Sequence, residues 1–395
     1  MLIRLRRKTA SPQFAQKIIN LAGIYLHIPF CKQACTYCNF HFTTSLRHKD
    51  ELVKAIVKEI SAEKEYFNGE TINTIYFGGG TPSLLTDSEI QVVLSSIHQN
   101  YRIAGDAEIT LEANPDDISF EKLNEWKTNG INRLSIGVQS FYEEELRWMN
   151  RAHDAEQAVD SLQLAVSSFN NITMDLIYGS PLLTDEMWKN NVDKATELGI
   201  KHLSCYALTV EEKTPLHKLI KTNGSSDVDN EKQARQFLLL MDWLREKGYE
   251  HYEVSNFAMP GYRSRHNSSY WRGEKYLGLG PSAHSYDGKA RRWNIANNQL
   301  YISGMNDSFP KRETELLTRE QQLNEYIMVS IRTIEGIDLE KIRLNWGDTE
   351  SARLEMQLKK FRDQGLMHSD NKSARLTDEG MLRADGIASE LFVNY

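Results

Sequence analysis

The chain has 395 residues, 40% of them hydrophobic and 26% charged, and a formal net charge of −7 at pH 7. A chain of this length is expected to form more than one domain, because single cores stop growing at roughly 250–300 residues. The acidic balance argues against a general nucleic-acid-binding protein, which is normally basic. No run approaches the ~18 consecutive apolar residues of a membrane-spanning helix.

The first 22 residues form a basic extension. Its charged residues are all positive: Arg4, Arg6, Arg7, Lys8 and Lys17. An arginine-rich leader without acidic residues is typical of organellar transit peptides. An extension without a structural role, or a start codon assigned too far upstream, would have the same composition. The sequence leaves these three readings open.

Six segments have the β-branched and aromatic content of buried strands. They are residues 23–28, 74–77, 108–113, 133–138, 173–178 and 202–208. Segments with helical periodicity lie between several of them, at residues 49–67, 87–97 and 155–166, the last preceded by the capping residue Asp154. Strands and helices that alternate in this way are typical of parallel βαβ units.

Polar residues and glycines gather where these strands end. A cysteine-rich loop follows the first strand, and Gly78-Gly79-Gly80 follows the second. The third strand ends near Glu112, the fourth ends before Gln139, and the fifth contains Asp175. Ligand sites of parallel barrels are built at this face from successive strand–helix loops. We therefore predict an α/β fold with a partial (β/α)6 TIM-type barrel over residues 23–250.

The remaining chain divides into two further parts. Residues 251–310 are rich in aromatic residues, histidine and glycine, and are expected to connect to the barrel and complete its core. Helical periodicity returns at residues 320–333, 339–346 and 349–364, followed by a strand-like pair near 367–368 and 374–376. Residues 311–395 therefore predict an α+β, winged-helix-like domain. Without a basic excess, this domain is not expected to bind DNA.

Three clustered cysteines are the strongest chemical signal. Cys31, Cys35 and Cys38 form a C-x3-C-x2-C array, whereas Cys205 lies far downstream. A [4Fe–4S] cluster usually takes four thiolates, so three would leave one iron open to another ligand. Structural zinc needs a fourth donor, which His27 or His41 could supply, but no second C-x2-C-type pair is present. We favour an iron–sulfur cluster in a reducing compartment, the cytoplasm.

With this array the chain resembles the radical SAM superfamily. In that superfamily the three cysteines hold a [4Fe–4S] cluster whose fourth iron binds S-adenosylmethionine. The triple glycine at 78–80, one strand after the cysteine loop, matches the superfamily's glycine motif. Glycine suits this place because a Cβ would block close approach of the backbone to the ligand.

The resemblance narrows to the branch that holds oxygen-independent coproporphyrinogen III oxidases and HemW-type heme chaperones. The matching strings are YxHIPFC at 25–31, GGGTP at 78–82, SIGVQSF at 135–141 and DLIYG at 175–179. This resemblance implies that the following residues bind S-adenosylmethionine: Tyr25, Gly79, Gly80, Thr81, Glu112, Gln139, Arg151 and Asp175. A surface salt bridge is the alternative role for Arg151.

Three features favour the heme chaperone family over the oxidase. The oxidase resembles C-x3-C-x2-C-x-C, and here the place of its additional cysteine is taken by Phe40. Residues 266–271 look like the H-N-x-x-Y-W string of the chaperone group, and only a short segment precedes the first strand. We predict a protein that binds heme and delivers it to an acceptor, with the oxidase as the alternative. The sequence does not decide whether the chain is an enzyme.

The sequence does not decide which residue would bind the heme iron. Heme iron can be held by His, Cys, Tyr or Met, so His266, His284 and Cys205 are all candidates. His266 could equally be a structural hydrogen-bonding residue, and Cys205 a small buried hydrophobic residue. The acceptor protein, an association with membranes or respiratory proteins, and a homodimer are likewise left open.

Overall fold

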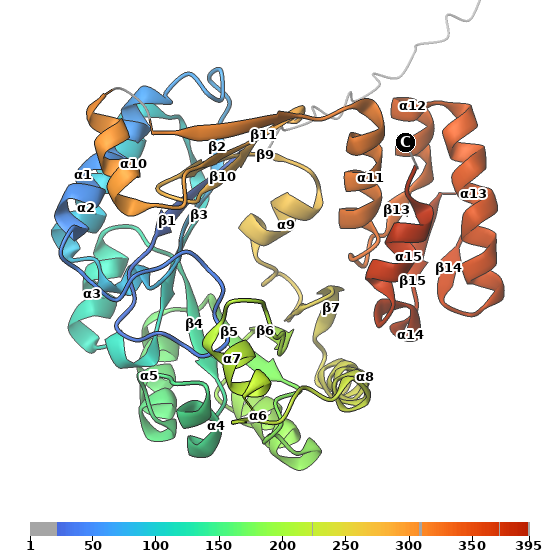
Figure 1. The fold of residues 1–395 in the computed structure, drawn as a ribbon, viewed down its shortest axis with the longest axis horizontal. Coiled ribbons are helices and arrows are strands. Elements are labelled where there is room, and N and C mark those ends of the chain that lie inside the picture. The colour runs from blue at the N-terminus through green and yellow to red at the C-terminus, as the bar shows by residue number, and fades with distance from the viewer. Residues whose placement is uncertain (1–21, 223, 308–309, 371, 394–395) are drawn as a thin grey trace, which may run out of the picture.

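The computed structural model describes residues 22–222, 224–307, 310–370 and 372–393 (Figure 1). The predicted basic extension lies outside the described residues except for Ala22, which begins strand β1 (Ala22–Ile28). In the part of the chain that is described, no helix is long and apolar enough to cross a bilayer.

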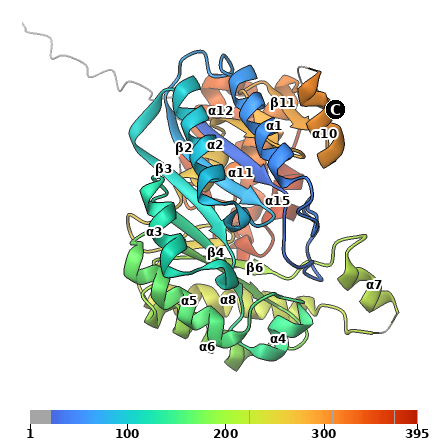
Figure 2. The same cartoon turned by 90° about the vertical axis from the view of Figure 1, so that its left-hand side faces the viewer.

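Six parallel strands form the centre of the fold, as predicted. They are β1, β2 (Ile72–Gly79), β3 (Ile103–Ala113), β4 (Arg133–Gln139), β5 (Ile172–Tyr178) and β6 (His202–Ala207). Each pairs in parallel with the next in chain order. The intervening helices cover the outer face of this sheet (Figures 1 and 2). They are α1 (Lys49–Ala62), α2 (Asp87–Asn100), α3 (Phe120–Thr128), α4 (Glu143–Trp148), α5 (Ala155–Ser168) and α6 (Asp185–Glu197). The predicted cap Asp154 forms a capping box with Gln157 at the start of α5.

Alternation along each strand separates two environments. In β3, Ile109 and Leu111 belong to the main hydrophobic core beneath the helices, whereas Glu108 and Glu112 point the other way, into the lumen of the partial barrel. Successive side chains of a strand point to opposite faces, so the residues two positions before and after Glu108 or Glu112 in β3 also face the lumen. Cys205 lies on the helix side, buried in the core beside its register partner Leu176.

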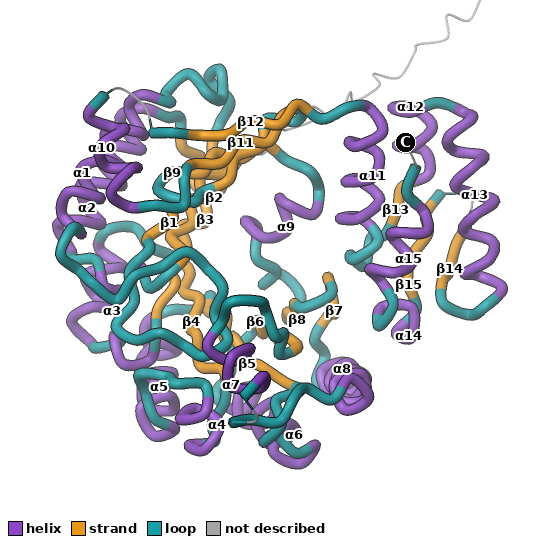
Figure 3. Tube along the Cα trace, in the orientation of Figure 1, coloured by secondary structure: helices purple, strands orange, loops and turns teal. Residues whose placement is uncertain are grey.

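Strands β7 to β12 extend both edges of the sheet. On one edge, β8 (Asn256–Ala258) pairs with β6 and β7 (Glu250–Glu253) pairs with β8, both antiparallel. On the other edge, β9 (Lys275–Leu279) runs parallel to β1 and is followed by β10 (His284–Tyr286), β11 (Ala290–Asn294) and β12 (Arg312–Leu316). The result is one sheet of twelve strands within the described residues. Helix α9 (Arg265–Trp271) lies against β1 and β2, between the curved sheet and the C-terminal helices (Figure 3).

The C-terminal part has a hydrophobic core of its own. It consists of α11 (Arg319–Ser330), α12 (Leu339–Trp346), α13 (Asp348–Asp363), α14 (Asp378–Met381) and α15 (Ala384–Leu391). A small antiparallel sheet joins β13 (Ile337–Asp338), β15 (Ser373–Leu376) and β14 (Met367–Ser369). Three helices and the strand pair were predicted, but β13, α14 and α15 were not. The other helices are α7 (Pro215–Lys221), α8 (Asn230–Glu246) and α10 (Asn298–Asn306), and two short 3₁₀ turns span Pro82–Leu84 and Pro115–Asp117.

A buried carboxylate joins α1 to the added edge of the sheet. Glu59 is 1% exposed and accepts hydrogen bonds from the Gly280 N–H (2.9 Å), the Tyr301 hydroxyl (2.7 Å) and Asn294 Nδ2 (2.8 Å). Arg312 forms an ion pair with the same carboxylate at 3.3 Å. Burial raises the pKa of Glu59, although these four partners all oppose the rise. The carboxylate is therefore held in place by its donors.

We expect Glu59→Ala to destabilise the protein by about 3–5 kcal/mol, because it leaves several buried donors without an acceptor. Urea denaturation followed by far-UV circular dichroism should show a clearly lower midpoint. Glu51→Ala, at an exposed position of the same helix, is the matched control and should change stability by less than about 0.5 kcal/mol. Equal midpoints for the two variants would contradict a structural role for Glu59.

Candidate functional site

The three clustered cysteines lie on a loop that leaves the C-terminal end of β1. The base of this loop is closed by two backbone hydrogen bonds, from the Cys31 N–H to the Thr43 carbonyl (3.0 Å) and from the Thr43 N–H to the Pro29 carbonyl (2.9 Å). Cys31, Cys35 and Cys38 are free thiols and partly exposed. The loop is therefore fixed at its base and presents sulfur atoms beyond the strand ends.

Neighbouring strand–helix loops hold the cysteine loop from the sides. Lys32 forms ion pairs with Asp116, at 2.7 Å, and with Asp117, both of which follow β3. Asn150, after α4, donates to the Ala34 carbonyl at 2.7 Å. Tyr37 packs into a small apolar cluster with Ile177 of β5 and Leu208, which follows β6. Elements from across the barrel thus set the position of the cysteines, which local sequence could not do.

The cysteines face a cavity of about 450 Å³ at the C-terminal ends of β2 to β6. Seven of the eight residues that the resemblance assigned to S-adenosylmethionine line it: Gly79, Gly80, Thr81, Glu112, Gln139, Arg151 and Asp175. The eighth, Tyr25, lines an adjacent larger cavity instead. The structure therefore brings together residues that are up to 144 positions apart (175 − 31) in the sequence.

Gly79 and Gly80 line this cavity at positions where a side chain would collide with neighbouring residues. Gly79 has φ +109° and donates its N–H to Glu112 Oε2 at 3.1 Å. A Cβ on Gly79 would lie 2.6 Å from the ring of His27, and one on Gly80 would lie 2.7 Å from the Phe30 carbonyl oxygen. These positions bring the β2 backbone to the edge of the cavity without a side chain in the way.

Glu112 and Asp175 in the cavity wall are buried, which disfavours their charged forms. Burial raises the pKa of Glu112 to about 7, against the hydrogen bond from the Tyr76 hydroxyl (2.8 Å), while the nearby charge of Asp175 adds to the rise. Burial also raises the pKa of Asp175 to about 6, and hydrogen bonds from Ser204 and Ser135 oppose that rise. Such perturbed carboxyl groups in a cavity are typical of ligand sites.

Arg151 is the cation of this cavity. Its guanidinium donates to the Gly137 carbonyl (2.6 Å), to Asn114 Oδ1 (2.8 Å) and to Cys35 Sγ (3.1 Å). Its Nε is buried and has no hydrogen-bond partner among the described residues. These contacts replace the surface salt bridge that the sequence left as an alternative. A planar guanidinium whose Nε–H is not hydrogen-bonded within the described structure can pair with the carboxylate of a ligand.

Gln139 ends β4 in a strained conformation. Its φ is +72°, a left-handed value that residues other than glycine seldom adopt, and the pairing of β4 with β5 shifts register between Gly137 and Gln139. The bulge turns the end of the strand toward the cavity, which Gln139 lines. Strain of this kind is found where function requires a particular side-chain direction.

The donor set fits the cofactors of the radical SAM superfamily. Three thiols provide ligands for an iron–sulfur cluster. The carboxylates, amides and single guanidinium of the lining can receive an amino acid and ribose hydroxyls. Within the described ranges, no group of three His, Cys, Asp or Glu side chains is placed to hold a single metal ion. A cluster does not need such a group, because its thiolates bind different irons.

Sequence reasoning missed several residues of this cavity. Asn114, Ser135, Gly137 and Tyr206 also line it. Ser135 and Tyr206 follow the same period-two alternation as Asp175, so extending that alternation along every strand would have found them. Asn114 directly follows the last residue of β3, where ligand-binding residues of parallel barrels are expected.

A second, larger cavity of about 1040 Å³ adjoins the first, and Asn39 and Phe40 line both. His266, predicted as a heme contact, lies beneath its floor and is 1% exposed. The His266 ring stacks on Tyr76 (centroids 4.9 Å apart), and its nitrogens hydrogen-bond Thr74 Oγ1 at 2.8 Å and the Tyr270 hydroxyl at 2.9 Å. In this conformation His266 joins α9 to the lumen of the barrel.

Comparisons with known proteins show similarity to one superfamily along most of the chain. Residues 25–195 match the radical SAM superfamily, and residues 317–383 match the HemN C-terminal domain. The chain is 32% identical over 366 residues to the heme chaperone HemW of Bacillus subtilis, covering 92% of this chain and 97% of that protein. It is 31% identical over 406 residues to the mitochondrial radical S-adenosyl methionine domain-containing protein 1 of Bos taurus, covering 97% and 90%. The solved structure of coproporphyrinogen III oxidase (HemN) from Escherichia coli has a TM-score of 0.82 at 24% identity, covering 95% and 90%, which shows a shared fold.

Glu112 should make the stability of the ligand-free protein depend on pH. Its pKa is raised to about 7 by burial, so the folded state binds more protons than the unfolded state between pH ~4.5 and ~7, and stability falls as pH rises through this window. Glu112→Gln removes this loss and should reduce the difference in melting temperature between pH 5 and pH 8. Glu51→Gln, on the surface of α1, is the control. An unchanged pH dependence in Glu112→Gln would contradict the buried-carboxyl interpretation.

Proposed function

The chain belongs to the HemW heme chaperone family of the radical SAM superfamily, and we propose that it binds heme and delivers it to an acceptor protein in the cytoplasm. The observation that carries this proposal is the extent of the similarity, which covers more than nine-tenths of both chains for relatives named as heme chaperones. The acceptor is to be sought among proteins that need heme.

The cysteine loop would hold a [4Fe–4S] cluster through Cys31, Cys35 and Cys38. When bound, this cluster supplies one-electron reducing chemistry next to S-adenosylmethionine. Arg151, whose Nε has no partner in the described structure, would pair with the methionine carboxylate of that cofactor. Glu112, Gln139 and Asp175 would accept hydrogen bonds from its amine and hydroxyl groups, and the glycine run would admit it close to the β2 backbone.

The residue after Asn39 favours a chaperone over an oxidase. Phe40 is 67% exposed and lines both cavities. The chain's only cysteine outside the loop, Cys205, is buried on the helix side of β6. No additional thiol is therefore available beside the cluster loop, where the oxidase carries one.

Oxidative decarboxylation of coproporphyrinogen III is the alternative activity. The structural similarity to HemN supports it at the level of fold. Anaerobic reconstitution of the cluster, followed by two parallel assays, separates the two functions. One titrates heme and follows its absorbance, and the other measures vinyl formation from coproporphyrinogen III with reductant and S-adenosylmethionine. We expect heme binding without vinyl formation, and robust decarboxylation would overturn the chaperone proposal.

We expect Cys38→Ser to abolish the cluster, because Cys38 lines the cavity as one of only three thiols. His266→Ala should leave the cluster intact, since the ring of this α9 residue is buried and hydrogen-bonded to Thr74 and Tyr270. Iron and sulfide content after anaerobic reconstitution, together with the visible absorbance of the cluster, checks both. Unchanged iron in Cys38→Ser would contradict the ligand assignment.

A further inference from the structure

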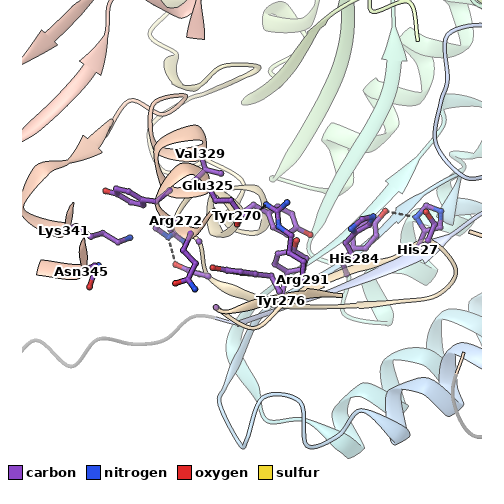
Figure 4. Close-up of a pocket in the computed structure, with 18 of the residues that line it drawn as sticks. His27, Tyr270, Arg272, Tyr276, His284, Arg291, Glu325, Val329, Lys341 and Asn345 are labelled. Atoms are coloured by element: carbon purple, nitrogen blue, oxygen red, sulfur yellow. Dashed lines mark hydrogen bonds and ion pairs between the residues drawn. The ribbon is translucent and has the colours of Figure 1, made fainter. Parts of the chain in front are cut away.

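The larger cavity extends from the barrel to the C-terminal helices (Figure 4). At one end lies His27 on β1, and at the other lie Lys341 and Asn345 on α12. Tyr276, His284 and other residues of β9 to β11 line the stretch between them. A ligand of the size of this cavity would therefore touch both the sheet and the C-terminal part.

Aromatic side chains make up much of its wall. They are Tyr25, Phe40, Tyr270, Tyr276, Tyr286, Tyr326 and Trp346. The Tyr270 and Tyr276 rings meet edge to face with centroids 4.6 Å apart, and Tyr326 stacks on Trp346 at 5.5 Å. Walls of this kind favour a large, flat, unsaturated ligand, which can stack on ring faces and meet ring edges.

The charge of the cavity is positive after internal pairing. Arg272 is paired with Glu274 at 2.6 Å, and Arg291 with Glu325 at 2.9 Å, so these four charges cancel within the wall. Two further lining cations, Arg319 and Lys341, have no carboxylate partner among the described residues. Arg319 donates to the Asn345 carbonyl (3.1 Å), and the Lys341 ammonium lies 4.4 Å from the centroid of the Tyr326 ring. Burial lowers the pKa of Lys341, and the nearby charges of Asp338 and Glu274 oppose that fall without forming an ion pair with it among the described residues.

Three histidines line the cavity, and their ring nitrogens differ in availability. His27 is bonded at both nitrogens, to the Tyr25 hydroxyl (3.1 Å) and the His41 carbonyl (2.9 Å). His41 uses Nε2 to bond Asn298 at 2.8 Å. His284 is exposed, its ring stacks on Trp293 at 5.8 Å, and neither of its nitrogens has a hydrogen bond in the described structure. His284 is thus the histidine best prepared to bind a metal ion.

We infer that this cavity is the heme site, with His284 as a ligand of the heme iron and Arg319 and Lys341 as the partners of its two carboxylates. The inference rests on the proposed function and adds the place and manner of binding. Two unpaired cations match the two negative charges of the heme edge, the aromatic walls match its faces, and a free imidazole matches its iron. The other two ligand candidates are less available, because both ring nitrogens of the buried His266 are hydrogen-bonded and Cys205 faces the helix layer.

Heme titration of the full-length, cluster-reconstituted chain tests the iron ligand. Soret spectra and dissociation constants are compared for the unmodified protein, His284→Ala, His266→Ala and His98→Ala, the last an exposed histidine of α2. We expect His284→Ala alone to shift the Soret maximum and to weaken binding at least tenfold. Cluster absorbance and far-UV circular dichroism confirm that each variant is folded. A normal Soret band and affinity in His284→Ala would overturn the inference.

A second titration tests the carboxylate partners, with heme and heme dimethyl ester as the two probes. The unmodified protein should bind the diester at least tenfold more weakly, because the ester has no charge for Arg319 and Lys341 to pair with. In the double variant Arg319→Ala/Lys341→Ala the two probes should bind alike. Arg343→Ala is the control, because Arg343 lies on α12 with Lys341 but forms an ion pair with Glu340 at 2.6 Å.

These titrations distinguish failure of the proposed heme binding from failure of the proposed site. If the unmodified protein binds no heme, the proposed function fails together with this inference. If it binds heme, but the diester binds equally well and the His284 variant behaves normally, the proposed function stands and the site lies elsewhere. A Soret band lost only in His266→Ala would assign the iron to the floor of the cavity and overturn the role of His284.

Discussion

The burial of polar side chains in the lumen of the partial barrel is the constraint on which the rest of the structure depends. Period-two alternation sends apolar residues of β1 to β6 toward the helices, so polar residues of the same strands face inward. A buried polar group is costly unless it is bonded, and each inward position must therefore find a partner. The two ends of the lumen solve this problem in different ways.

At the N-terminal end the chain satisfies its own polar groups. Arg133 donates to Asn171 and Thr173, while Glu108 accepts from the backbone N–H groups of Arg265 and His266. Helix α9 thus completes the floor of the barrel with protein–protein hydrogen bonds. At the C-terminal end, Glu112 and Asp175 have raised pKa values, and Arg151 Nε has no hydrogen-bond partner among the residues that the structure describes. One end of the lumen is built for stability, and the other carries unmet bonding capacity that a ligand can use.

Local signals in the sequence predicted the six parallel strands, several of the helices and the polar residues Glu112, Gln139 and Asp175 at the strand ends. Arg151 was assigned only through the resemblance to the superfamily. Strand composition and the polar residue at each strand end are visible within a few positions of Glu112 or Asp175. What the sequence could not predict depends on distant pairing. β9 lies beside β1 although about 250 residues separate them (275 − 22), and α9 packs inside the sheet rather than over it. The larger cavity is lined by residues from distant parts of the chain, such as Arg291 and Lys341, so no sequence motif predicts it. The sequence singled out the histidine of the H-N-x-x-Y-W string, yet only the fold reveals that its two nitrogens are already bonded.

The wall that the two cavities share explains why one residue of the cysteine loop matters to both. Asn39 and Phe40 follow the last cysteine directly and line each cavity, so a ligand in either space meets the same short segment. Cys38 is joined to Phe40 through only two peptide bonds. A cysteine at position 40 would offer a thiolate to whatever lies in the larger cavity, whereas phenylalanine offers an apolar surface without a proton or a metal ligand. Such a surface would suit the macrocycle proposed for the larger cavity, and it would lie between that ligand and the cluster proposed for the smaller one.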